Sequence, residues 1–259
     1  MSKTPAIPEL GDVDNARMVY AATRDVWVGG GGWLEPHERL GLLTVAAGLR
    51  PFSLLNHLDK QPWDDTARLL AQFGLTCAPF KADFDYELDV TGPDAAMQAY
   101  IEHELKYPLD GLGVWSAGEV RSSAGLSEIG LLLCYPLCCC AMDCRTKAHD
   151  HSVTLQQLIE DADEDPEEVE ASLAGGRGAL PWTEERQEWG KRLDLTRSMF
   201  PCAVHTACDE CIHAAGESPT SNLSDLYRRL ALAVSNELDL MIRWACEVCR
   251  LAASGNDQV

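Results

Sequence analysis

The segment Gly125–Cys144, GLSEIGLLLCYPLCCCAMDC, decides the fold prediction for this chain. Its apolar residues recur at steps of three and four, which predicts a buried helix: Leu126, Ile129, Leu132 and Leu133. Pro136 lacks a backbone donor and clashes with the preceding turn, so this helix must end or kink near Cys134 and Tyr135.

Three consecutive cysteines, Cys138, Cys139 and Cys140, follow the predicted break. Neighbouring residues on a helix point about 100° apart. Cys138 and Cys139 can therefore reach one ion only if the backbone turns locally, and Pro136 gives a reason for such a turn.

A second cluster follows Pro201 and consists of Cys202, His205 and the CxxC pair Cys208 and Cys211. Thiolates bind soft or borderline metals, and four of them can close a tetrahedral zinc site or hold an iron–sulfur cluster. The sequence predicts that the two clusters form one metal centre, with these ligands: Cys138, Cys139, Cys202, Cys208, Cys211 and His205. Excess thiols favour iron–sulfur, whereas the histidine favours zinc. We interpret the other isolated cysteines as small buried side chains: Cys77, Cys134, Cys246 and Cys249.

The run EIGLLLCYPLCC resembles a segment of the form E-x-G-x-L-x-G-Y-P-x-C-C in poorly characterised prokaryotic proteins of the DUF483 type, and FPCAVHTAC resembles their later proline–cysteine segment. Cys134 stands where a glycine is usual, and Cys140 extends the cysteine pair. The resemblance covers two short patches. It implies that four cysteines belong together, and it supplies no reaction: Cys138, Cys139, Cys202 and Cys208.

The sequence lacks the residues that several classes of enzyme require. Zinc-dependent base deaminases need His-x-Glu, and the chain has none. A G-x-S-x-G nucleophile elbow is absent. Thioredoxin-like chemistry is disfavoured because the two acids between Cys208 and Cys211 oppose a thiolate.

The formal net charge of −20 argues against nucleic-acid binding, which depends on Lys and Arg. The N-terminal residues are polar, and no apolar run is long enough to span a bilayer, so we expect no signal peptide and no membrane association. Clustered cysteines without a disulfide framework favour the cytoplasm. The sequence identifies neither a small-molecule substrate nor a protein partner.

The fold prediction is mainly α, with α+β as the alternative and a small β element near residues 75–90. We expect an N-terminal region, residues 1–120, and a cysteine-rich helical region, residues 121–259, or one continuous domain. Residues 108–125 are expected to form a loop. Helices are predicted over Val13–Val28, 36–49, Pro62–Phe73, Asp94–Tyr107, two segments within Val153–Leu173, Trp182–Met199 and Leu223–Ala253.

Three functional hypotheses remain open. The first is a metal-dependent or iron–sulfur enzyme of biosynthetic or redox metabolism, in which Glu128 or Tyr135 handles protons. The second is a non-catalytic adaptor whose zinc ion closes the fold. The third is metal storage or sensing by the surplus thiols.

Overall fold

The computed structural model describes residues 9–24, 36–55, 63–83, 110–116, 120–164 and 184–255. Helices dominate these ranges, which confirms the mainly α prediction. The helices are α1 (Val13–Thr23), α2 (Pro36–Ala46), α3 (Trp63–Ala71), α5 (Leu126–Leu132), α6 (Leu137–Glu164), α8 (Glu184–Met199), α9 (Asp209–Ala214), α10 (Pro219–Val234) and α11 (Asn236–Gly255). None of the helices within these ranges is long and apolar enough to cross a membrane.

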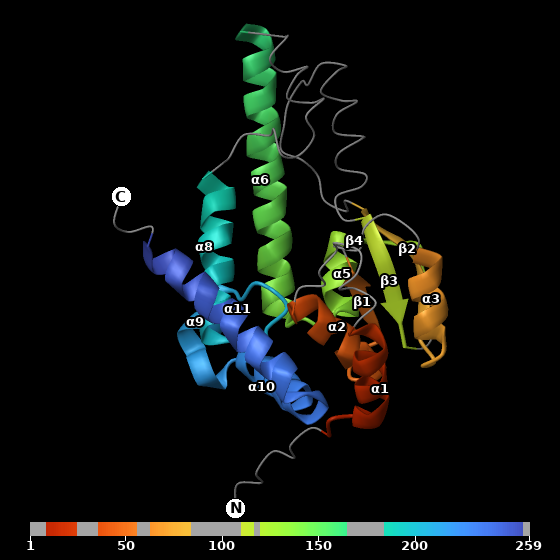
Figure 1. Cartoon of the computed structure of the whole chain (residues 1–259). Coiled ribbons are helices and arrows are strands. Elements are labelled where there is room, and N and C mark those ends of the chain that lie inside the picture. Colours follow the sequence, from red (N-terminus) through yellow and green to blue (C-terminus); the bar gives the residue numbers. More distant parts are fainter. Residues whose placement is uncertain are drawn as a thin grey trace, which may run out of the picture.

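A four-stranded sheet lies beside the helices, in the order β1 (Phe52–Leu55), β3 (Asp110–Trp115), β2 (Thr76–Asp83) and β4 (Ser123–Gly125) (Figure 1). β3 pairs antiparallel with β1 and β2, and β2 pairs parallel with β4. The expected strand near 75–90 is present as β2, whereas residues 84–100 lie outside the described ranges.

The prediction of a loop over residues 108–125 is wrong where the structure describes this segment, because the segment contains β3 and β4. The strand DGLGVW was not predicted, because glycines such as Gly113 have a low preference for strands. A Cβ at Gly113 would lie 3.1 Å from atoms of both Phe52 and Phe80, so the glycine allows two aromatic rings to close over the central strand. These rings and Trp115 pack in one apolar cluster.

The largest core cluster joins α1 and α2 to α10 and α11, and includes Leu40, Leu43, Leu112, Leu230 and Ile242. It therefore draws side chains from both regions that the sequence suggests. The expected helices over 94–107 and 166–173 lie outside the described ranges.

Two long helical segments differ from the prediction. α6 runs without interruption from Leu137 to Glu164, where a new helix was expected near Val153, and in Figure 1 its later turns extend beyond α8. The expected single helix over 223–253 is two helices, α10 and α11. They separate at Ser235, whose backbone is extended with φ of −159° and ψ of 128°. Ser235 also accepts a hydrogen bond from the N–H of Asp239, so it begins the next helix.

Cys134 ends α5 in a left-handed conformation with φ of 56°, directly before the proline break. It is exposed, so the interpretation of Cys134 as a buried side chain is wrong. Glycine favours this backbone conformation, and the segment that the sequence resembles has glycine at this position.

Replacing Cys134 by glycine should raise the free energy of unfolding by about 1 kcal/mol, because the left-handed conformation costs a residue with a Cβ about 1–2 kcal/mol. Glycine's greater freedom in the unfolded chain offsets part of this gain. Urea denaturation measures the change. Cys134→Ser is the matched control, since it removes the thiol but keeps the Cβ, and it should leave stability unchanged. An equal effect of the two substitutions would contradict the backbone explanation.

Candidate metal centre

The proline break between α5 and α6 directs two neighbouring cysteines into the interior. The carbonyl of Pro136 accepts hydrogen bonds from the N–H groups of Cys139 and Cys140 at 2.9 and 3.0 Å. α6 therefore begins with Cys138 and Cys139 in its first turn. Their sulfur atoms are 4.0 Å apart. The turn after the proline is thus sufficient to direct adjacent cysteines toward one point.

The CxxC pair lies at the start of α9. Cys208 directly precedes this helix, and its carbonyl accepts a hydrogen bond from the N–H of Ile212 at 3.0 Å. Cys211 follows within the first turn, so both thiols lie on one side of the helix start. The connection from α8 is fixed by the N–H of Ala207, which donates to Thr196 Oγ1 at 2.9 Å.

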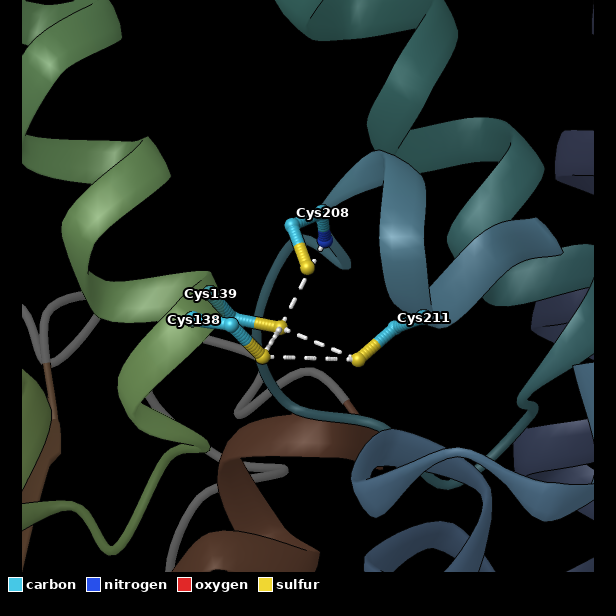
Figure 2. A group of neighbouring side chains, drawn as sticks. All are labelled: Cys138, Cys139, Cys208 and Cys211. Carbon is cyan, nitrogen blue, oxygen red and sulfur yellow. Dashed lines mark hydrogen bonds between the residues drawn. The ribbon is translucent and has the colours of Figure 1, made fainter. Parts of the chain in front are cut away.

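The two helix starts bring four sulfur atoms into one group, formed by Cys138, Cys139, Cys208 and Cys211 (Figure 2). All four lie within 4.8 Å of one another. Cys211 Sγ is 3.7 Å from the sulfur atoms of both Cys138 and Cys139. Cys138 is half-buried and the other three are buried. The chain therefore has four cysteines close enough to bind a metal ion, which we call the four-cysteine group.

Hydrogen bonds favour the thiolate form of Cys139 and Cys211, whereas burial opposes it. The N–H of Cys208 donates to Cys139 Sγ at 3.4 Å, and Thr220 Oγ1 lies 3.4 Å from the same sulfur. Burial nevertheless raises the pKa of Cys139, and it raises the pKa of Cys138 to about 11. At Cys211 burial is outweighed by hydrogen bonds from Thr220 and the neighbouring thiols, so its pKa is lowered. Cys211 is thus the first of these three thiols to ionise.

The sequence also suggested Cys202 and His205 as ligands, and both lie outside the four-cysteine group. The N–H of Cys202 donates to Ser224 Oγ at 3.1 Å, and its side chain packs in the largest core cluster. His205 Nε2 lies 3.0 Å from Thr220 Oγ1. Because Thr220 also contacts Cys139, the imidazole is linked to the group through a hydroxyl. Of the four cysteines that the resemblance places together, only Cys202 is separate.

The two candidate proton carriers have other partners. Glu128 forms an ion pair with Arg121. The hydroxyl of Tyr135 donates to the carbonyl of Val204 at 2.7 Å, and its ring lies 4.8 Å from that of His205. Burial raises the pKa of Tyr135, which opposes its use as a proton carrier near neutral pH.

Sequence reasoning missed Thr220, whose hydroxyl lies between His205 and Cys139. It is the second residue of α10, and its helix begins with the Ser218 cap, which accepts a hydrogen bond from the N–H of Ser221. The Ser-Pro start predicts the helix cap, but no spacing in the sequence links Thr220 to the cysteines. Tertiary packing alone brings it to the group.

Lowering the pH from about 7 to about 5 should cost about 2 kcal/mol of stability through His205. Burial lowers the pKa of this histidine from 6.5 to about 4. Between these values the unfolded chain binds a proton that the folded chain does not. The stability that His205 contributes is therefore complete above pH 6.5 and is lost as the pH falls toward 4.

Urea denaturation of the wild type and His205→Gln at these two pH values measures this contribution. His205→Gln should lose less stability on acidification, and the exposed His213→Gln should behave as the wild type. Acid loss of a bound metal affects all three proteins, so it cancels in the comparison. Identical pH dependence in the wild type and His205→Gln would show that the buried imidazole is not responsible.

The fold and the four-cysteine group define a mainly helical protein with a site of metal-binding geometry. No family model, no curated protein and no solved structure matches this chain.

Proposed function

We propose that the protein is a metalloprotein in which the four-cysteine group holds one tetrahedral metal ion. The sulfur separations support this proposal. In a tetrahedron with metal–sulfur bonds of about 2.3 Å, the sulfur atoms are about 3.8 Å apart. Three of the separations here are 3.7, 3.7 and 4.0 Å. These three separations support coordination of a single ion.

The same separations disfavour an iron–sulfur cluster, the alternative that the excess of thiols in the sequence favoured. In a cluster the cysteines bind different iron atoms, so their sulfur atoms lie farther apart than around one ion. Among single ions, zinc is favoured because a buried four-thiolate tetrahedron is its usual structural site.

A structural role for the ion is favoured over a catalytic one. Four protein thiolates fill a tetrahedron, whereas a catalytic zinc keeps one position open. Glu128 and Tyr135 are engaged with Arg121 and Val204. The ion would join the start of α6 to the start of α9, two segments far apart in the sequence. We therefore infer a non-catalytic binding or adaptor protein whose fold is held together by a zinc ion. Its thiols would be reduced, as expected in the cytoplasm.

Elemental analysis with an absorption spectrum, on protein purified without oxygen, tests this proposal. We expect one zinc per chain and no visible absorption. Iron with sulfide and broad visible absorption would overturn it in favour of a cluster. One iron without sulfide would retain the geometry but indicate electron transfer. More than one metal per chain would favour storage by the remaining thiols.

A catalytic site is the second candidate, because Cys139 also lines a cavity. Cobalt substitution separates the two roles, since the visible absorption of cobalt depends on its ligands. Added cyanide should leave the spectrum unchanged if four thiolates close the site. A new spectrum without unfolding would indicate an open position and favour the enzyme.

A further inference from the structure

A cavity of about 370 Å³ lies among α2, β1, α5, α6 and α8. Small-molecule sites have volumes of roughly 300–1,000 Å³ and are mostly apolar with a few polar groups. This cavity follows that pattern. Leu54, Ile129, Leu133 and Leu193 contribute apolar surface, and Arg50 and His205 line the same space.

Arg50 is the unusual member of the lining, because its side chain is 4% exposed and carries a charge. Its Nη2 donates to Ser53 Oγ at 2.7 Å. Its Nε and Nη1 are buried and have no hydrogen-bond partner among the described residues. Gly41 makes room for the guanidinium, since a Cβ there would lie 2.4 Å from Arg50 Nη2. The fold therefore accommodates a buried cation, and two of its nitrogens have no hydrogen-bond partner in the part of the chain that the structure describes.

Two acids line the same cavity, Glu38 and Asp143, and among the described residues no salt bridge joins either of them to Arg50. Asp143 pairs with Lys147 at 2.7 Å and accepts a hydrogen bond from Trp189 Nε1 at 3.4 Å. Within the ranges that the structure describes, no carboxylate forms an ion pair with Arg50. A buried charge without a counterion is strongly unfavourable. An anionic ligand would remove this penalty.

A second polar group points to the same conclusion. His205 is 7% exposed, and its Nδ1 is buried without a hydrogen-bond partner among the described residues. Burial keeps this imidazole neutral, because it lowers the pKa to about 4. The cavity wall therefore combines the buried cation of Arg50 and the neutral Nδ1 of His205 with a largely apolar surface. Four other charged residues also line it: Glu38, Asp143, Lys147 and Arg197. An apolar wall of this extent fits a ligand with a hydrocarbon body better than it fits a phosphate ion.

We propose that the cavity binds a small carboxylate with a hydrocarbon body. The carboxylate accepts hydrogen bonds from the guanidinium of Arg50, and the hydrocarbon contacts the leucines and Ile129. The carboxylate is not bound to the metal, so this proposal is independent of the proposed structural ion.

Isothermal titration calorimetry of the full chain as isolated tests the proposal, with sodium hexanoate as the probe. Hexanoate should bind saturably with one site per chain. Hexanol has the same hydrocarbon body without the charge, and it should bind about tenfold to a hundredfold more weakly, as should hexanoate to Arg50→Gln. Inorganic phosphate should not bind at this site.

Arg121→Gln is the matched control, because Arg121 is partly exposed, pairs with Glu128 and does not line the cavity. It should bind hexanoate as the wild type does. If Arg50→Gln does not fold, Gly41→Ala displaces the guanidinium while keeping its charge, and it should also weaken binding. Metal content is measured in every variant, so loss of hexanoate binding with unchanged metal separates this site from the metal centre.

Four results would overturn the proposal. These are no hexanoate binding to the wild type, equal affinity for hexanol and hexanoate, phosphate binding in place of hexanoate, and unchanged hexanoate affinity in Arg50→Gln or Gly41→Ala.

Discussion

Replacing Cys211 by serine should remove the bound metal and lower the free energy of unfolding by about 3 kcal/mol or more. Structural zinc sites contribute about 10–16 kcal/mol of binding free energy, and one of four ligands is lost. Cys211 is the best single target because its sulfur lies 3.7 Å from those of Cys138 and Cys139 and its pKa is lowered. Elemental analysis and urea denaturation of the purified variant measure the two effects.

Two cysteine variants provide the controls. Cys77→Ser changes a half-buried thiol of β2 outside the four-cysteine group, so metal content should remain at the wild-type value. Cys202→Ser is more discriminating, because the sequence suggested Cys202 as a ligand. Its side chain lies in the largest core cluster, so the variant should be less stable yet retain its metal. Equal metal content in Cys211→Ser and Cys77→Ser would refute the four-thiolate site.

The part of the site that sequence predicts best is the part fixed by local geometry. Pro136 cannot continue a helix, so the break before Cys138 follows from the residue type alone. The CxxC pair likewise needs only one helical turn to direct Cys208 and Cys211 to one point. The segment-level pattern therefore identifies all four members of the four-cysteine group.

The residues whose placement the sequence does not reveal are those whose neighbours come from distant segments. Cys202 and Cys208 look equivalent in FPCAVHTAC, but Cys202 belongs to the largest core cluster and its N–H donates to Ser224 of α10. Arg50 follows an apolar helix, and nothing local shows that its guanidinium is buried over Gly41. Such placements depend on long-range packing, which periodicity does not encode.

The strand errors have the same origin. DGLGVW has two glycines and a low local preference for strand. It becomes the second strand of the sheet, between β1 and β2, because Phe52 and Phe80 pack over Gly113. Local propensity predicted a loop, and contacts from two other strands overrode it.

Removing the metal should unfold the surroundings of the four-cysteine group and leave the sheet intact. The small core cluster at the site contains the ligands themselves, and Phe200 is its one large buried member among the described residues: Cys139, Phe200, Ala203, Ala207, Cys208 and Cys211. Cysteine and alanine bury little apolar area, so this cluster gains little free energy from packing. The largest core cluster contains many leucines and Tyr227 and needs no metal.

Hydrogen exchange with mass spectrometry, before and after treatment with a strong chelator, measures this difference. Peptides covering residues 200–214 and the first turns of α6 should lose protection by about 100-fold, because a loss of roughly 3 kcal/mol in local stability has that effect. Peptides covering α2 and β1 should keep theirs, since their side chains belong to the two other clusters. Cys211→Ser without chelator should reproduce the pattern. Exchange that rises equally in all peptides would show that the metal supports the whole fold, and exchange that does not change would show that the cysteines pack without an ion.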